Sequence, residues 1–133
     1  MLLDTVVKHN LADSAYNDRR HSCERVVEVI QKDHPEVTFL RDVSMELLES
    51  YKGKVSDEDY MRAEYVVEEI QRVLDVSEAL EKDDYETVGK KMYETHKGMS
   101  QLYEVSCEEL DYLNEIAMEC GVTGSRVMGG GFG

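Results

Sequence analysis

Basic residues are scarce in this sequence of 133 residues. Lys and Arg number 15 against 29 Asp and Glu, so the formal net charge at pH 7 is −14. A nucleic-acid partner needs Lys and Arg clustered against its phosphates, and we therefore expect none. The sequence also lacks any apolar run approaching the ~20 residues that cross a bilayer. It lacks the basic start and apolar core of a signal peptide as well, so we expect no membrane association and a cytoplasmic location.

Cysteine and histidine are too few and too scattered to predict a metal centre or a disulfide framework. The three cysteines are an odd number without CxxC spacing, and the four histidines form no pair at metal-ligand spacing. These residues are Cys23, Cys107, Cys120, His9, His21, His34 and His96. We therefore expect reduced thiols and no metal ligands in the chain.

Apolar residues recur mainly at helical spacing, which predicts an α+β fold that is predominantly α-helical. Ser44 and Ser56 are expected to cap helices, and Ser106 opens a capping box. An apolar, β-branched stretch at the start and an extended piece near the end predict short strands. The predicted helices are 16–32, 45–51, 57–82, 85–102 and 107–120, and the strand-like pieces are 2–7 and 123–128.

The two long helices, 57–82 and 85–102, are joined by a short connection, which predicts an antiparallel hairpin. The inner face of the second contains His96, among Met and Tyr residues. A lone His in such surroundings is more often a hydrogen-bonded core residue than a catalyst. The buried stripe predicted for the first consists of Ala63, Val66, Val67, Ile70, Val73, Leu74, Ser77 and Leu80.

The end of the chain is unusually rich in glycine, at Gly129, Gly130, Gly131 and Gly133 around Phe132. Backbone N–H groups in such a run can cradle a phosphate. Composition alone favours a frayed terminus over a phosphate loop. However, the pattern stops without a polar residue to close it, which suggests a piece of a longer protein.

Two separated stretches carry a resemblance to a known family. Residues 14–24 read SAYNDRRHSCE, similar to the pattern S-x-Y-N-x-R-R-x-x-C-E of the galactokinases. Residues 124–133 read GSRVMGGGFG, similar to the third kinase motif of that family, G-(S/V)-R-M-T-G-G-G-F-G-G-C. Segments 40–43, 92–96 and 103–111 also match in kind and order. The chain thus resembles the C-terminal half of a galactokinase, in the superfamily of galactokinase, homoserine, mevalonate and phosphomevalonate (GHMP) kinases.

The resemblance implies roles for two elements. Tyr16 matches the tyrosine that reaches the sugar hydroxyls, and residues 129–133 match the loop that closes against the site of phosphate transfer. The intact enzyme uses ATP and Mg²⁺ and phosphorylates galactose at its C1 hydroxyl. Arg19 and Arg20 are assigned to structure, tying the helix start to carboxylates. A local departure is Val127-Met128, where the family more often has Met-Thr.

The resemblance also implies that much of a complete enzyme is missing. The sugar-holding first motif and the ATP-wrapping second motif precede Leu2 in the family, as do the groups that act on the sugar C1 hydroxyl. We therefore expect residues 1–133 to be a partial C-terminal domain, with no catalytic residue and no metal ligand. Alone it is expected to bind neither ATP nor Mg²⁺, to be inactive, and to self-associate through the exposed strand 2–7.

Two other functions are compatible with the residues. The acidic helices could form a non-enzymatic interaction module, but such a module has no use for the glycine run. A separate nucleotide-binding domain is less favoured, because one glycine loop without a Lys or a following helix holds phosphate poorly.

Overall fold

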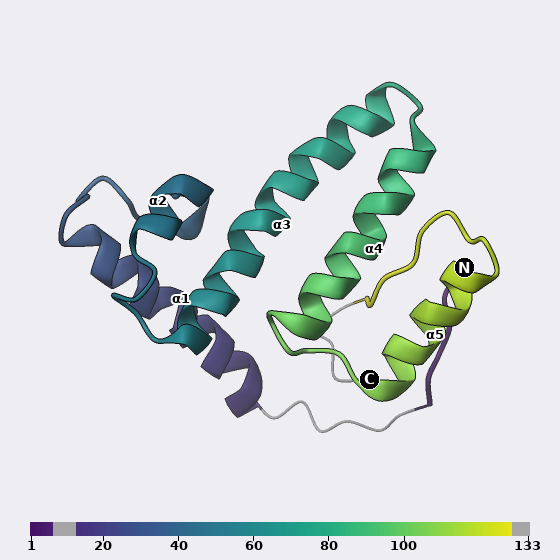
Figure 1. Cartoon of the computed structure of the whole chain (residues 1–133), viewed down its shortest axis with the longest axis horizontal. Coiled ribbons are helices and arrows are strands. Elements are labelled where there is room, and N and C mark those ends of the chain that lie inside the picture. Colours follow the sequence, from purple (N-terminus) through teal and green to yellow (C-terminus); the bar gives the residue numbers. More distant parts are fainter. Residues whose placement is uncertain (7–12, 129–133) are drawn as a thin grey trace. The chain divides into compact units, whose positions relative to one another are not determined.

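The computed structural model describes residues 1–6 and 13–128, without the side chains of residues 13, 14 and 16. Its elements are helical (Figure 1): α1 (Asp13–Gln31), the 3-10 turn η1 (Leu40–Asp42), α2 (Met45–Ser50), α3 (Asp57–Glu81), α4 (Tyr85–Gln101) and α5 (Glu108–Glu119). No helix in the described ranges is long and apolar enough to cross a membrane. The predicted helices are thus confirmed, with ends shifted by a few residues.

The chain divides into two compact units, and α3 contributes to both. One unit is Ala12–Gln71, and the other is Met1–Leu11 together with Arg72–Gly133. The first contains a continuous apolar core made by α1, η1, α2 and the first half of α3. Its buried members are Val26, Val27, Ile30, Val37, Leu40, Val43, Leu48, Tyr51, Tyr60, Ala63 and Val67.

Serine caps begin two of the helices, as predicted. The hydroxyl of Ser44 accepts the N–H of Leu47 at 3.1 Å, and that of Ser56 accepts the N–H of Asp59 at 3.1 Å. Each bond satisfies a backbone donor that the first helical turn leaves unpaired. The local sequence therefore determines where α2 and α3 begin.

Two arginines join α1 to α3 in the first unit. Arg25 forms a two-pronged ion pair with Asp59, with distances of 2.8 and 2.9 Å. Arg62 is only 3% exposed and donates to Asp18 at 3.0 Å and to Ser22 at 2.8 Å. Buried charges need such partners, because an unpaired one is costly to desolvate.

Cys23 lies on α1 beside this network. Burial, reinforced by the charge of Asp59, raises the pKa of its thiol to about 11. Because the thiolate is the reactive form, Cys23 acts as a core residue. The other two cysteines, Cys107 and Cys120, are free as well.

In the second unit, a tight connection turns the chain from α3 into α4. Asp83 has a φ of +56°, a left-handed conformation that suits a turn. Asp84 caps α4 by accepting the N–H of Thr87 at 3.2 Å. Asp75 near the end of α3 lies 3.6 Å from Lys91 on α4. The short connection and this ion pair agree with the predicted antiparallel hairpin.

The buried face of α3 differs from the prediction after Ile70. Val73, Leu74 and Leu80 are 59%, 60% and 50% exposed, whereas Ala79 is buried. The more protected residues in this half are Arg72, Asp75, Val76 and Ala79, which are spaced three and four apart and share one face. The two halves of α3 belong to different units, so one apolar stripe does not describe both.

Other expectations about side chains were also wrong. Helical spacing predicts that Arg20 shares the inward face of α1 and Tyr85 that of α4, but both side chains are exposed. Arg20 instead forms an ion pair with Glu24 at 3.0 Å, which agrees with its assigned structural role. Arg19 donates to the carbonyl of Ala15 at 3.2 Å.

The two predicted strands are not found among residues 1–6 and 13–128. At the start of the chain, Val6 donates its N–H to Asp4 at 2.8 Å and has a φ of +60°. A side-chain bond two residues apart forms a local turn rather than an extended strand. Residue 7, the end of the predicted strand, lies outside the described range.

The Arg25–Asp59 pair predicts how acid weakens the first unit. Arg25, and more weakly Ser22 and Ser56, hold the pKa of the Asp59 carboxyl below its usual range against the opposing effect of burial. Its stabilising contribution is therefore complete above the unfolded pKa, about 3.9, and is lost as the pH falls through the lower folded pKa. Asp59→Asn should lower the free energy of unfolding by about 1–3 kcal/mol near neutral pH, and by less in acid.

Urea unfolding followed by circular dichroism across this pH range measures the effect. Asp57→Asn is the matched control, because Asp57 is an exposed carboxylate in the same first turn. An equal loss at neutral and acid pH for Asp59→Asn would contradict the assignment.

Candidate functional site

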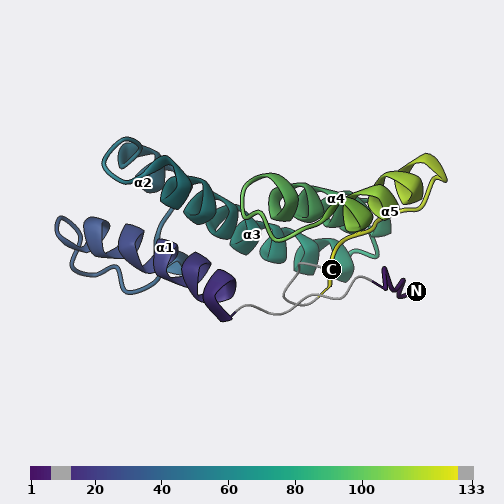
Figure 2. The same ribbon diagram turned by 90° about the horizontal axis from the view of Figure 1, so that it is seen from below.

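The segment that leads to the glycine run lies against α4. Gly121, with a φ of +77°, turns the chain after α5, and residues 122–128, which we call the arm, then pass back alongside α4 (Figures 1 and 2). Within the arm, Val127 is 2% exposed while Met128 is 74% exposed. The arm is therefore anchored at Val127, two residues before the glycine run.

Two glycines allow the arm to approach the α4 backbone closely. A Cβ on Gly89 would lie 1.9 Å from the carbonyl oxygen of Thr123, and a Cβ on Gly124 would lie 2.5 Å from the Cα of Gly89. Both distances are far below van der Waals contact, and the obstructing atoms are backbone. Glycine is therefore required at position 89, although a glycine inside a helix otherwise lowers the stability of that helix.

Side chains of α4 and α5 bind the backbone of the arm. Tyr93 of α4 donates its hydroxyl to the carbonyl of Val122 at 2.6 Å. Asn114 of α5 donates to the carbonyl of Ser125 at 2.9 Å. His96 of α4 accepts the N–H of Val127 on its Nδ1 at 3.2 Å. Within the described residues, the arm is not paired with a strand. These side chains therefore supply hydrogen bonds that its backbone groups need.

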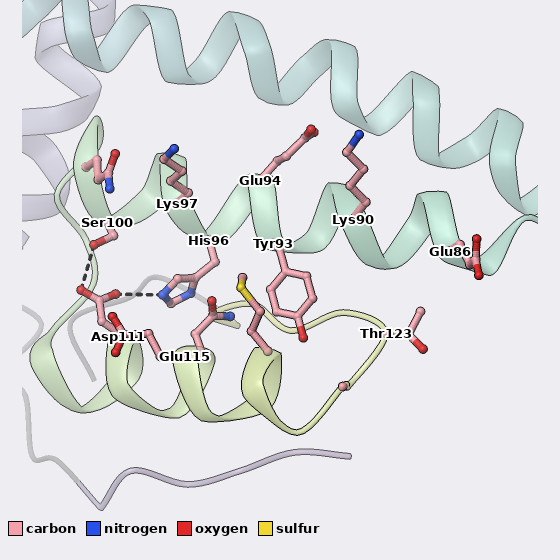
Figure 3. A pocket seen from close by; sticks show the side chains of 14 residues that line it. Glu86, Lys90, Tyr93, Glu94, His96, Lys97, Ser100, Asp111, Glu115 and Thr123 are labelled. Atoms are coloured by element: carbon pink, nitrogen blue, oxygen red, sulfur yellow. Dashed lines mark hydrogen bonds and ion pairs between the residues drawn. The ribbon is translucent and has the colours of Figure 1, made fainter.

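The opposite nitrogen of His96 is held by a carboxylate. Its Nε2 lies 2.8 Å from Oδ1 of Asp111 on α5 (Figure 3). The same carboxylate accepts the hydroxyl of Ser100 at 2.9 Å and that of Ser106 at 2.7 Å. The expectation that His96 is a buried, hydrogen-bonded residue is confirmed, since it is 5% exposed. The capping role predicted for Ser106 is wrong, because Cys107 occupies the N-cap and the Ser106 hydroxyl points to Asp111 instead.

These contacts determine the protonation pattern of His96. Nδ1 accepts the amide proton of Val127, so the ring proton of the neutral imidazole resides on Nε2 and is donated to Asp111. Burial disfavours the charge of Asp111, but hydrogen bonds from Ser106, His96 and Ser100 outweigh it and hold the pKa of the carboxyl below its usual range. Asp111 is therefore an ionised acceptor at neutral pH.

A Ser, His and Asp together suggest nucleophilic catalysis, but the geometry does not support it. In a catalytic triad the serine hydroxyl bonds to one imidazole nitrogen and the carboxylate to the other. Here both serines bond to the carboxylate, and a backbone amide occupies the second nitrogen of His96. His96 has no nitrogen left to accept a substrate proton.

A groove of about 760 Å³ lies beside this network and is lined by α4, α5 and the arm. Figure 3 shows His96 and Tyr93 projecting from α4 toward α5. The groove lining includes Lys90 and Lys97 of α4 and glutamates of both helices, Glu94 of α4 and Glu115 of α5 among them. Among residues 1–6 and 13–128, His, Cys, Asp and Glu form no group of three that could hold a metal ion.

The predicted site residues lie largely outside what the structure describes. Tyr16 lies in α1, but its side chain is not described, and residues 129–133 fall beyond the described range. Their sugar and phosphate roles stay predictions.

Comparison with known proteins identifies the chain's relatives. Residues 76–133 match the family model "GHMP kinases C terminal". Human galactokinase is 42% identical to the chain over 100% of the chain's length. The galactokinase of Thermotoga maritima is 41% identical over 99% of the chain's length. The chain is thus similar to galactokinases along essentially its whole length. The similarity extends to three dimensions, since the structure of Lactococcus lactis galactokinase complexed with galactose matches 98% of the chain with a TM-score of 0.89 and 26% identity.

The chain spans about a third of the length of these galactokinases, namely 33% of the human protein, 35% of the Thermotoga protein and 34% of the Lactococcus chain. The resemblance recognised in the two sequence motifs is therefore confirmed. The alternative of an acidic interaction module receives no support from these relatives.

The residues that hold the arm were not recognised as a site from the sequence. The motifs at 92–96 and 103–111 matched the family, but nothing in them showed that Tyr93, His96 and Asp111 act together. Gly89 offered a usable signal, because a glycine inside a helix calls for a packing reason.

Gly89→Ala should displace the arm. Alanine normally favours a helix over glycine by about 1 kcal/mol, but here its methyl group would overlap the Thr123 backbone. We expect a net destabilisation of about 1–3 kcal/mol and faster amide exchange at Val127.

Thermal unfolding and amide hydrogen exchange by NMR measure both effects. Lys90→Ala, at the exposed neighbouring position on α4, is the matched control and should leave Val127 protected. A stabilised Gly89→Ala variant with unchanged exchange at Val127 would show that the close approach is absent.

Proposed function

We propose that residues 1–133 form part of the C-terminal domain of a galactokinase, an enzyme that transfers the γ-phosphate of ATP to the C1 hydroxyl of galactose. The observation that carries this proposal is the identity of 41–42% to galactokinases over essentially the whole chain. The galactose complex of the similar Lactococcus enzyme supports galactose as the sugar. The cytoplasmic location expected from the sequence belongs to the same proposal.

Phosphoryl transfer depends on positioning the reactants and neutralising charge around the transferred group. In this proposal Tyr16 contacts the sugar hydroxyls, and Gly129, Gly130, Gly131, Phe132 and Gly133 form the loop beside the phosphates. Among the described residues, His, Cys, Asp and Glu form no group of three that could hold a metal ion by themselves. Metal binding and the groups that act on the sugar are assigned to parts of the enzyme beyond this chain.

A chimera tests the proposal. Residues 1–133 replace the matching segment of Thermotoga maritima galactokinase, and ADP release is measured with galactose and ATP. We expect turnover by the chimera and none by the chain alone, because the groups that act on ATP and the sugar are assigned to other parts of the enzyme. A folded chimera without turnover would contradict the proposed function. Turnover by the chain alone would contradict the assignment of the metal-binding and sugar-activating groups to other parts of the enzyme.

The same chimera tests the role of Tyr16. Tyr16→Phe removes one hydroxyl and should raise the KM for galactose by about three- to tenfold, while the KM for ATP stays unchanged. Tyr112→Phe is the matched control, because Tyr112 is 63% exposed on α5. If the two substitutions changed the KM for galactose equally, the proposed contact between Tyr16 and the sugar would be contradicted.

Self-association of the chain is a separate part of the proposal. The described N-terminal residues expose Met1, Leu2, Leu3 and Val6, and exposed apolar segments favour contacts between copies. Light scattering over a range of concentrations should show a mass that rises with concentration. A monomer at every concentration would contradict it.

A further inference from the structure

His96 has two hydrogen bonds with different consequences. The bond to Asp111 joins α4 to α5, whereas the bond to Val127 joins α4 to the arm. His96 and Val127 are 5% and 2% exposed, so water does not readily replace either partner. An imidazole nitrogen can accept an amide proton only while it is unprotonated. The donor on Nε2 and the acceptor on Nδ1 are thus linked through one ring.

Asp111 selects the form of the ring that can hold the arm. Its carboxylate needs donors, and the Nε2 proton of His96 supplies one beside the hydroxyls of Ser100 and Ser106. A neutral imidazole has a single ring proton, so placing it on Nε2 leaves Nδ1 free to accept. The same logic governs histidines whose second nitrogen is fixed by a carboxylate at metal sites.

The position of Val127 gives this bond its significance. The arm is otherwise held at Val122 by Tyr93 and at Ser125 by Asn114. Of the bonds from α4 and α5 to the arm, that of His96 lies nearest the glycine run, two residues before Gly129, and Met128 beyond it is largely exposed.

We propose that His96 is a positioning residue whose Nδ1, left unprotonated because Asp111 takes the Nε2 proton, anchors Val127 and so sets the point from which the chain enters the glycine run. The anchoring of Val127 is argued from the hydrogen bonds of His96 with Asp111 and Val127. Its consequence for phosphate transfer rests on the proposed function of the chain as part of a kinase. A small displacement of a positioning element can cost a reaction up to about a hundredfold in rate.

Two isosteric substitutions separate the two bonds. The amide of Asn superposes on the Nδ1 side of a histidine, so His96→Asn keeps an acceptor for the N–H of Val127 and loses the donor to Asp111. The amide of Gln reaches the Nε2 side, so His96→Gln keeps the donor and loses the acceptor. A purely structural role gives no reason for the Asn variant to protect Val127 better than the Gln variant.

NMR on the 133-residue chain provides the first readout. The imidazole nitrogens of His96 should report the Nε2–H form, with a through-bond coupling between Nδ1 and the amide nitrogen of Val127. Amide exchange at Val127 should be slow in the wild type and in His96→Asn, and fast in His96→Gln. Asp111→Asn removes the carboxylate that accepts the Nε2 proton of His96. The ring proton should then shift toward Nδ1, and the amide of Val127 should exchange faster.

Activity of the chimera provides the second readout, at a temperature where every variant is folded. His96→Gln should lower kcat by roughly ten- to a hundredfold with the KM for galactose unchanged, and His96→Asn should recover most of the loss. An Nδ1–H ring in the wild type, or equal exchange at Val127 in the Asn and Gln variants, would overturn the proposal. The NMR result needs no turnover, so it decides the positioning role even if the chimera is inactive and the proposed function fails.

Discussion

The close approach between Gly89 on α4 and the backbone of Thr123 and Gly124 is the constraint on which the candidate site depends. Neither glycine has room for a methyl group. Because the backbones meet at this point, the arm lies within reach of Tyr93 on the same helix. If the arm moved away from α4, Tyr93 and His96 would lose their bonds to it, and these backbone groups would have to be satisfied by water.

The polar network around His96 then makes the position of the arm specific. Buried polar groups are costly unless each finds a partner, and here the ring, the carboxylate and the arm amide satisfy one another. Displacing Val127 would leave Nδ1 of a buried imidazole without a donor. The network therefore penalises alternative positions of the arm more strongly than a purely apolar contact would.

The sequence was most informative where a local rule decides the structure. Ser44 and Ser56 begin helices because their hydroxyls satisfy nearby N–H groups, and this needs no knowledge of the rest of the chain. The family was recognisable because two motifs occur in order at a fixed separation. His96 was expected in the core on its apolar neighbours alone, and that expectation is confirmed.

The sequence was least informative where partners come from distant segments. Ser106 was predicted to be a cap from its spacing, but its hydroxyl donates to Asp111, a carboxylate that also binds His96 and Ser100 of the separate helix α4. The stripe of Val73 and Leu74 was extended along α3 by periodicity, although the second half of that helix belongs to another unit. No spacing rule could pair Gly89 with Gly124, since nothing local relates the two positions.

The central claim is that the arm backbone touches α4 at Gly89. The most direct measurement is the nuclear Overhauser effect between the α-protons of Gly89 and Gly124 in the isotopically labelled chain. A strong cross-peak is expected, because the backbones are so close that a Cβ on Gly124 would lie 2.5 Å from the Cα of Gly89. Absence of this cross-peak, with random-coil shifts for Gly124, would contradict it.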